Sequence, residues 1–223
     1  HQNFRQKEPG RTVAELEWLK QRYGAQRFFF TDECVALSPA KRLCQQIIDK
    51  KLDIKWTCEM RFEKHLTREL LASMRDAGCL KIVFGLESFN QRVMDFMKKG
   101  IKQEWVRRIA DDCVDLGIAV HCYIIVGFPT EKEEEARETM NFIVENEQLH
   151  GSYGFSCQPC LFDLEKEAPI MSDPGSYGIR RIMRPSAEDL SLGFFYEVSE
   201  GMTPDEAERL YQHVYEKVSE VVC

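Results

Sequence analysis

Apolar and polar positions alternate along the chain in blocks that predict strands and helices in turn. The clearest block is 80–86, a nearly continuous apolar run that follows Gly78 and ends at the polar pair Glu87 and Ser88. Such a run is typical of a strand in a parallel sheet that is covered on both faces. Because α/β proteins bind ligands at the carboxyl ends of their strands, the polar pair marks a candidate site.

The same pattern recurs along the first 160 residues. Further strands are expected at 27–31, 54–58, 119–126 and 153–158. Periodic apolar positions predict helices between them, at 12–23, 38–51, 67–77, 90–97, 103–116 and 130–145. Strands that alternate with helices of this length form right-handed βαβ units and a parallel sheet. We therefore expect an α/β fold, a partial (β/α) TIM-like barrel, because a complete barrel has eight strands.

The predicted helix starts carry N-capping signals, either a capping-box spacing or a Ser or Thr before the first turn. These starts are Thr12 with Glu15, Ser38 before Pro39, Thr67, Thr130 with Glu133, and Thr203 with Glu206.

The pattern weakens after Cys160. Prolines and glycines interrupt 161–185, which predicts a long loop, and 186–196 is a candidate helix. A final amphipathic helix begins at Thr203. We therefore expect a partial barrel over 1–160, and a loop with a C-terminal helical extension over 161–223.

Composition narrows the class of protein. The 223 residues include 30 basic and 37 acidic side chains, a net charge of −7, and no basic cluster, which argues against a nucleic-acid partner. No run of 18 apolar residues predicts a membrane span, and no secretory signal is recognisable. Nine cysteines, an odd number and mostly inside apolar patterns, fit a reducing cytoplasm better than a disulfide scaffold.

Polar or special residues follow each predicted strand. They are Asp32 and Glu33, Arg61, Glu87 and Ser88, Gly127 and Pro129, and Gln158. Taken singly, such residues solvate strand ends or cap the next helix as readily as they bind a ligand. Taken together at one mouth of a barrel, they favour a small-molecule site.

Three of these segments resemble one family. Phe-Phe-Thr-Asp-Glu at 29–33, Gly-Leu-Glu-Ser-Phe-Asn at 85–90 and Ile-Ile-Val-Gly-Phe-Pro-Thr-Glu at 124–131 resemble the radical S-adenosylmethionine (radical SAM) enzymes. The similarity covers about 3–160. It is closest to the subgroup with an upstream cobalamin-binding domain, which includes the anaerobic magnesium-protoporphyrin IX monomethyl ester cyclases.

The resemblance implies a fold and a chemistry. The family fold is a six-stranded partial barrel, of which the five strands here would be the second to the sixth. In the family a four-iron (4Fe-4S) cluster held by CxxxCxxC chelates S-adenosylmethionine. Its reductive cleavage gives a 5′-deoxyadenosyl radical that modifies or methylates an organic substrate. The resemblance adds cobalamin as a candidate cofactor.

Residue roles follow by resemblance only. Asp32 or Glu33 takes the place that contacts the methionine amino group, and Glu87 with Ser88 the place that binds the ribose hydroxyls or the methionine carboxylate. Gly127 to Pro129 match the segment along the adenine, and Gln158 matches the end of the sixth strand. The list is completed by Arg61, which we expect to pair with the methionine carboxylate unless it is a surface arginine paired with Glu59 or Glu63.

The chain departs from the family in one respect, because it contains no CxxxCxxC. The spaced pair Cys157 and Cys160 is the only close one, and no second pair or His motif accompanies it. Since the chain begins with His1, we expect a fragment that starts just after the cluster loop and is inactive alone. Two alternatives stay open: a non-catalytic barrel that serves as a binding or assembly module, and another barrel enzyme that uses Glu87 and Asp32 as acid and base.

The expected partners are a small-molecule substrate, the upstream cluster loop and a cobalamin-binding domain of the same polypeptide. The strand at 27–31 would have an uncovered edge, which also makes an oligomer a candidate.

Overall fold

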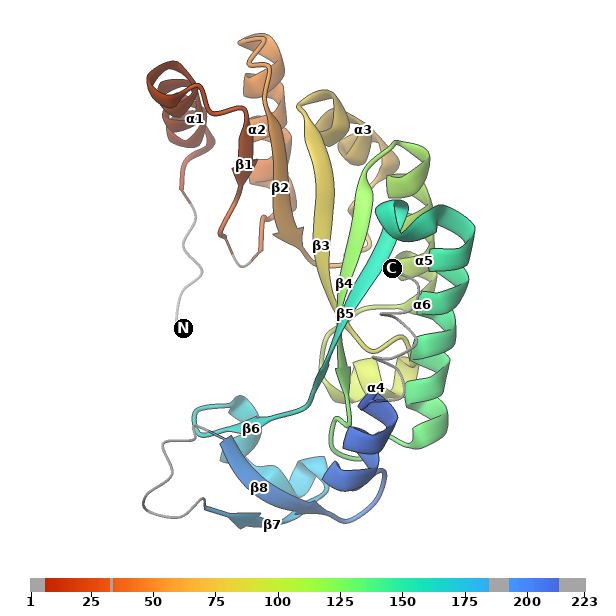
Figure 1. Ribbon diagram of the computed structural model, residues 1–223. Helices are drawn as coiled ribbons and strands as arrows, with labels where there is room; N and C mark the ends of the chain where they lie inside the picture. Colours follow the sequence, from red (N-terminus) through yellow and green to blue (C-terminus); the bar gives the residue numbers. More distant parts are fainter. Residues whose placement is uncertain (1–6, 33, 185–192, 213–223) are drawn as a thin grey trace. The chain divides into compact units, whose positions relative to one another are not determined.

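The computed structural model describes residues 7–32, 34–184 and 193–212 (Figure 1). The strands are β1 (Arg27–Phe29), β2 (Lys55–Met60), β3 (Cys79–Glu87), β4 (Ala119–Val126), β5 (Phe155–Leu161), β6 (Leu164–Glu165), β7 (Ile179–Met183) and β8 (Gly193–Val198). The helices are α1 (Pro9–Tyr23), α2 (Leu37–Asp49), α3 (Arg68–Asp76), α4 (Gln91–Phe96), α5 (Gln103–Asp115), α6 (Glu133–Gly154), and the 3-10 helices η1 (Pro169–Ser172) and η2 (Pro174–Tyr177). Residues 204–212 are also helical.

The first five strands form one parallel sheet in the order β1-β2-β3-β4-β5. Arg27 of β1 lies opposite Lys55 of β2, and Thr57 of β2 lies opposite Lys81 of β3. The predicted α/β class and the sequential strand order are confirmed. The first strand is shorter than predicted, although Phe30 still donates its N–H to the Thr57 carbonyl at 2.9 Å.

The packing divides the chain into two compact units. The first comprises His1–Leu86, Gln103–Cys122 and Tyr153–Ser156. The second comprises Glu87–Lys102, Tyr123–Ser152 and Cys157–Cys223. The expected domains 1–160 and 161–223 divide the sequence differently, and they stay a prediction.

In the first unit one face of the sheet packs against the helices, because alternate strand residues are apolar. Trp56 and Cys58 of β2 and Ile82 of β3 are buried on this face. Trp56 stacks on Phe30 at 5.0 Å between ring centroids and donates its indole N–H to the Ala77 carbonyl at 2.8 Å. Figure 1 shows α1, α2, α3 and α5 on this side of the strands.

The intervening residues point to the other face of the same strands. They include Thr57 of β2, Lys81 of β3, His121 of β4 and Ser156 of β5, all partly exposed. We call this the helix-free face. Unlike the helix-covered face, it is mostly polar in the first unit.

Two of the predicted helix caps are confirmed. Thr67 accepts a hydrogen bond from the Leu70 N–H at the start of α3. Thr203 and Glu206 form a reciprocal capping box, in which the Thr203 N–H donates to Glu206 at 2.8 Å and the Glu206 N–H donates to the Thr203 hydroxyl at 3.3 Å.

Three of the predicted caps are wrong. Helix α1 starts at Pro9, not after Thr12, because proline suits the first helical position. Helix α2 starts at Leu37, so Ser38 lies inside its first turn. Thr130 has a φ of 72°, outside the extended region that an N-cap requires, and Glu135 instead accepts from the Lys132 N–H at 2.8 Å.

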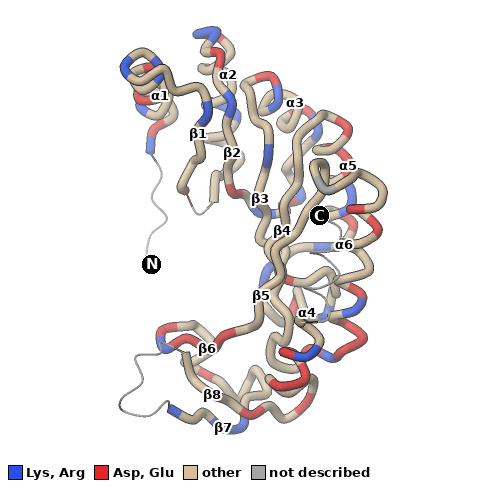
Figure 2. Tube along the Cα trace, viewed as in Figure 1, with Lys and Arg blue, Asp and Glu red and all other residues tan. Residues whose placement is uncertain are grey.

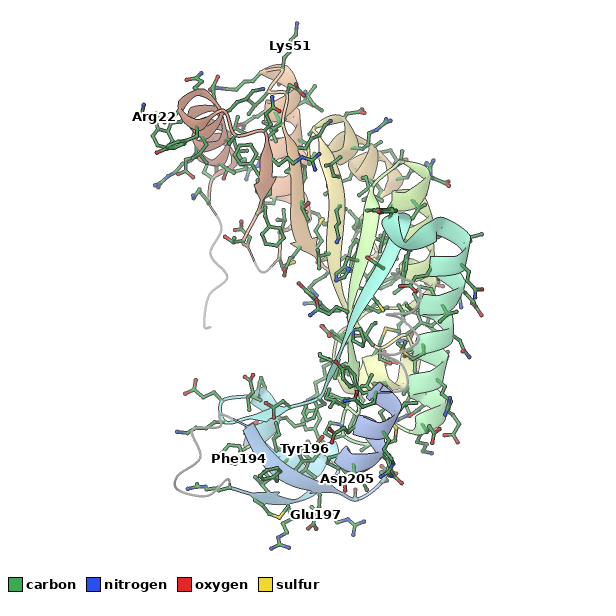
Figure 3. The ribbon with its side chains drawn as sticks, in the orientation of Figure 1. Arg22, Lys51, Phe194, Tyr196, Glu197 and Asp205 are labelled. Atoms are coloured by element: carbon green, nitrogen blue, oxygen red, sulfur yellow. The ribbon has the colours of Figure 1, made fainter. Side chains whose placement is uncertain are left out.

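The second unit contains a small antiparallel sheet in the order β6-β8-β7. The expected helix at 186–196 is therefore wrong where it is described, since 193–198 is strand; 185–192 lie outside the described residues. Alternation explains this, because Phe194 and Tyr196 lie on one face of β8 and Glu197 on the other (Figure 3). Tyr196 belongs to a buried apolar cluster with Leu164, Ile170 and Ile179. The loop expected over 161–185 contains β6, η1, η2 and β7.

None of the helices in the described part of the chain is both long and apolar enough to cross a membrane.

Candidate functional site

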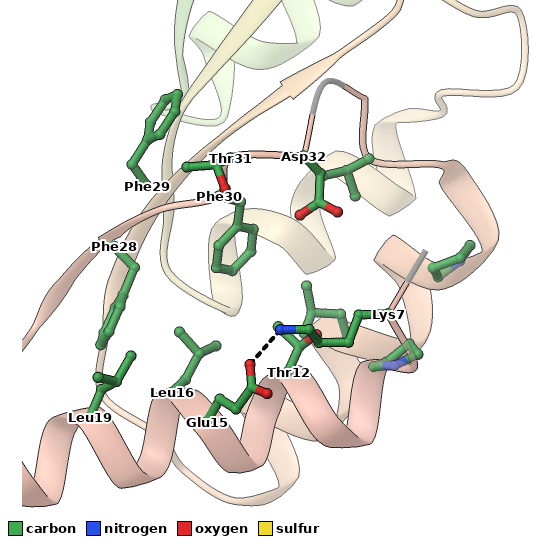
Figure 4. A pocket seen from close by; sticks show the side chains of 14 residues that line it. Lys7, Thr12, Glu15, Leu16, Leu19, Phe28, Phe29, Phe30, Thr31 and Asp32 are labelled. Carbon is green, nitrogen blue, oxygen red and sulfur yellow. Dashed lines mark hydrogen bonds and ion pairs between the residues drawn. The ribbon is translucent and has the colours of Figure 1, made fainter. Parts of the chain in front are cut away.

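In the first unit, Asp32 follows β1 and lies beside a pocket between this strand and α1 (Figure 4). The pocket has a volume of about 460 Å³. Lys7, Thr12 and Glu15 give it a polar end, and Lys7 pairs with Glu15 at 2.6 Å. Phe28 points toward Leu19 of α1, whereas Phe29 points away from the helix. Asp32 is thus an exposed carboxylate at the rim of a mixed pocket; Glu33 lies outside the described residues.

Arg61 directly follows β2 and is exposed. The segment that follows β1 is anchored to β2, because the Val35 N–H donates to the Glu59 carbonyl at 2.8 Å. The backbone N–H of Arg61 also donates a hydrogen bond to the sulfur of Cys34. The segments that follow β1 and β2 are therefore tied together, and Arg61 extends from a fixed backbone.

In the second unit, Glu87 ends β3 in a left-handed conformation with a φ of 65°. A residue other than glycine adopts this conformation at a cost of about 1–3 kcal/mol, which is a common feature of functional sites. Its carboxylate is 16% exposed and pairs with the ammonium of Lys99 at 2.8 Å. Burial and the charge of Glu87 raise the pKa of the nearby Cys160 thiol. The carboxylate of Glu87 and the ammonium of Lys99 therefore lie together at the end of β3.

Ser88, by contrast, is completely buried. Its hydroxyl lies 3.1 Å from the hydroxyl of Thr139 in α6 and accepts the Asn90 N–H at 3.2 Å. The Phe89 N–H donates to the same Thr139 hydroxyl at 2.9 Å. Ser88 thus holds the turn that orients Glu87.

Gly127 and Pro129 form the turn after β4. Gly127 has a φ of 81°, and a side chain there would lie 2.4 Å from the Cβ of Ala207. Its N–H donates to the carboxylate of Glu131 at 2.7 Å. Pro129 is buried. Glycine is therefore required by the approach of the helix at 204–212.

Glu131 is the buried acid of this turn, with 1% of its surface exposed. Its pKa is raised to about 7, chiefly by burial and also by the charge of Glu135, while hydrogen bonds from the backbone at Gly127 and Phe128 and the charge of Arg92 oppose the shift. Glu131 belongs to the motif at 124–131, but the sequence pattern predicted no role for it. An acid four residues after a strand-ending glycine was the available signal.

Arg92 of α4 is a second residue of this region that the sequence pattern did not predict. Its guanidinium pairs with Glu135 and donates to the Thr130 carbonyl at 2.8 Å. Two glycines pack against the same turn, because side chains at Gly178 and Gly201 would lie 2.6 and 2.5 Å from atoms of Thr130. The turn at 127–131 is consequently fixed on several sides.

Gln158 is exposed in β5. Cys157 and Cys160 belong to the same strand, three residues apart, so their side chains point to opposite faces. Burial, followed by the charge of Glu147, raises the pKa of Cys157 to about 12, whereas Cys160 donates to the Ile124 carbonyl at 3.3 Å. This pair is not placed to hold one metal ion together.

The remaining described cysteines do not form a cluster site either. Cys44, Cys58, Cys79 and Cys113 are buried in the core of the first unit. Burial raises the pKa of Cys44 to about 12 and raises those of Cys79 and Cys113 as well. Within residues 7–32, 34–184 and 193–212, no group of three or more His, Cys, Asp or Glu side chains is placed to hold a metal ion.

Comparison with known proteins decides the family. The model of the radical SAM superfamily matches residues 1–143, more than half of the chain. The chain belongs to the radical SAM superfamily. The predicted family is therefore confirmed, and membership implies S-adenosylmethionine and a 4Fe-4S cluster as the family's cofactors.

Relatives of this radical SAM chain include methyltransferases and a cyclase. It is 28% identical over 134 residues to the uncharacterized methyltransferase PH0819 of Pyrococcus horikoshii. This alignment covers 59% of this chain and 29% of that protein. It is 28% identical over 140 residues to the anaerobic magnesium-protoporphyrin IX monomethyl ester cyclase of Rubrivivax gelatinosus. This alignment covers 61% of this chain and 25% of that protein. The chain thus spans less than a third of the length of these relatives.

Among solved structures, the fold is similar to that of the radical SAM methyltransferase TsrM from Kitasatospora setae, determined with cobalamin and a 4Fe-4S cluster bound. The TM-score is 0.68 and the identity 18%, over 92% of this chain and 41% of that one. This similarity confirms the expected fold class. Together with the cyclase match it agrees with the predicted subgroup.

Proposed function

We propose that this chain is the S-adenosylmethionine-binding core of a longer radical SAM enzyme. The whole protein would cleave S-adenosylmethionine reductively to a 5′-deoxyadenosyl radical and modify or methylate a small organic substrate. The observation that carries the proposal is the family match over 1–143, which includes the strand ends at Asp32, Arg61, Glu87 and Gly127.

The polar strand ends suit the methionine part of S-adenosylmethionine. A carboxylate at Asp32 or Glu33 would accept hydrogen bonds from its ammonium, and the fork of Arg61 would hold its carboxylate. Glu87, paired with Lys99, offers both an acceptor and a neighbouring cation to the ribose hydroxyls or the carboxylate.

The other residues predicted to bind S-adenosylmethionine would have different roles. The turn at Gly127 to Pro129 would present its backbone along the adenine, with Glu131 holding the turn. The exposed amide of Gln158 would contact the ligand directly. Ser88 would act through the turn, since its hydroxyl is buried against Thr139.

The cluster does not fit the cysteines that the structure describes, because they are dispersed over different elements, most of them are buried, and Cys160 alone is exposed. We therefore place the CxxxCxxC ligands in another part of the protein, together with a cobalamin-binding domain, as the likeness to TsrM supports. The outer edge of β1 has no strand partner in the described part of the chain, so it offers a place for the preceding strand.

Comparing residues 1–223 with the longer protein tests the proposal. After anaerobic reconstitution, the shorter chain should stay colourless and form no 5′-deoxyadenosine. The longer protein should bind about four irons, as expected for one 4Fe-4S cluster, and form 5′-deoxyadenosine under reducing conditions. Cleavage by the shorter chain would show that the cluster is misplaced, and an inert longer protein would reject the radical chemistry.

Glu87→Gln in the longer protein tests the site itself. Losing a charge-assisted hydrogen bond costs about 1.5–3 kcal/mol, which is a loss of about 10- to 100-fold in affinity for S-adenosylmethionine. The matched control is Glu134→Gln, which removes the same charge from the exposed start of α6. Equal affinities of both variants would remove Glu87 from the site.

A second candidate function is a non-catalytic binding or assembly module. The lack of CxxxCxxC in these 223 residues favours it. It predicts that the longer protein also lacks the motif and binds no iron.

A further inference from the structure

A row of polar side chains crosses the helix-free face of the first unit. Thr57 of β2 lies opposite Lys81 of β3. Lys81 is close enough to His121 of β4 for its charge to lower the pKa of the imidazole. The Nδ1 atom of His121 lies 2.9 Å from the hydroxyl of Ser156 in β5. The four side chains therefore form one continuous row across four neighbouring strands.

This row is unusual for the position it occupies. Inward-facing positions of (β/α) barrels are usually filled by bulky apolar side chains. Here burial, together with the charge of Lys81, lowers the pKa of His121 to about 4, so the imidazole is neutral at pH 7. The hydroxyl of Ser156 also lies 3.4 Å from the Val120 carbonyl. Polar groups in such a place are costly unless they are hydrogen-bonded, as His121 and Ser156 are to each other.

Positive charge exceeds negative charge on this face. Lys81 is partly buried, and its ammonium has no ion pair or hydrogen bond among the residues that the structure describes. Arg27 and Lys55 lie directly opposite each other on β1 and β2, at the blue positions of these strands in Figure 2. Like charges in that arrangement repel each other. On these strands Glu59 supplies the opposing carboxylate, and no ion pair joins it to Lys81.

We propose that Lys81 and its row form a binding site for an oxyanion, a carboxylate or phosphate group. The ammonium of Lys81 supplies charge and donors, and the hydroxyl of Thr57 supplies a further donor. Within β3, Lys81 precedes Glu87 by six residues, a separation of about 20 Å. The site is therefore separate from the strand-end residues, and it goes beyond the proposed function.

The oxyanion has two potential sources with the same chemistry. One is a free small molecule that carries a carboxylate or phosphate. The other is an acidic side chain from another part of the longer protein. Both would bring negative charge to Lys81 and His121, and measurements on the longer protein separate them.

The imidazole of His121 reports on the site without any radical chemistry. Residues 1–223, with ¹⁵N-labelled histidine, are titrated with phosphate and then with malonate at constant ionic strength. A bound anion stabilises the imidazolium, so the pKa of His121 should rise by about one unit or more, and the response should saturate. The exposed His65 serves as an internal reference and should not respond.

Lys81→Met and its control separate the site from general charge effects. Removing Lys81 should raise the pKa of His121 without any anion, because a like charge is lost, and should abolish the response to phosphate. Lys41→Met, at an exposed position of α2, should change neither. If Lys81→Met does not fold, Thr57→Val provides the milder test and should weaken phosphate binding several-fold.

No saturable response to either anion, or an equal response in Lys81→Met, would overturn the proposal. The longer protein separates the two sources. A pKa of His121 that is already raised there, without added anion, identifies an acidic side chain of the same polypeptide. A pKa that rises only with phosphate or malonate identifies a free ligand.

Discussion

Replacing Glu131 by glutamine should change how stability depends on pH. The carboxylate of Glu131 is buried in the turn after β4 and accepts the Gly127 N–H at 2.7 Å. A glutamine side chain has the same shape and can accept that hydrogen bond through its own oxygen. It cannot ionise, so the variant isolates the contribution of the proton.

The magnitude follows from the raised pKa. In the unfolded chain Glu131 loses its proton near 4.5, whereas in the folded chain it keeps the proton until about 7. The stabilisation is complete below pH 4.5 and is lost as the pH rises toward 7, because ionisation then favours the unfolded chain. A difference of about 2.5 pH units corresponds to about 3 kcal/mol. Glu131→Gln should therefore gain about 3 kcal/mol relative to the wild type between pH 4.5 and 8.

Urea unfolding followed by circular dichroism measures this difference. With a slope of about 1–3 kcal/mol per M urea, the midpoint of the variant should move by about 1–3 M relative to the wild type over that pH range. A constant offset at all pH values would reflect the fit of the amide and is subtracted. Glu134→Gln serves as the control and should follow the wild type. If the two Glu131 curves run parallel, the carboxyl group does not carry a raised pKa and the buried-acid argument is wrong.

Two further predictions concern packing and thiol exposure. Gly127→Ala places a Cβ 2.4 Å from that of Ala207, at a position with a left-handed backbone conformation. It should destabilise the chain by about 2–4 kcal/mol, which lowers the melting temperature by about 5–15 °C. An unchanged melting temperature would contradict this packing. Under native conditions iodoacetamide should alkylate the exposed Cys160, while the buried Cys44 and Cys113 should react only after denaturation. Mass spectrometry of the labelled peptides measures this order, and labelling of Cys44 or Cys113 before Cys160 would contradict the prediction.

The regular part of the fold could be predicted because its signals are local. Apolar runs such as the one in β3 and periodic helices such as α5 carry their structure within a few residues. Propensity misplaced the start of α1, where Pro9 outweighed the capping signal of Thr12. In β8 the alternation of Phe194 and Tyr196 was present but short, and a short apolar run is ambiguous between strand and helix.

The candidate site depended more on distant packing. The strand-end positions of Glu87 and Gly127 follow from the strands themselves. The burial of Ser88 depends on Thr139 in α6, and that of Glu131 on the segment at 201–202, whose Met202 N–H donates to the Glu131 carbonyl at 2.8 Å. No pattern within the turn reveals contacts made by residues so far along the chain.

The packing of Gly178 and Gly201 against Thr130 has a consequence for synthesis on the ribosome. Thr130 is held by segments that include Gly178 and Gly201, and Gly201 is translated long after the turn has left the exit tunnel. Strands β1 to β4 can pair as they emerge, but the turn cannot reach its final shape until those late segments arrive. Truncating the chain at residue 160 would therefore leave this turn without its covering, and a nascent chain that stalls before Gly201 would present it unfinished to chaperones and proteases.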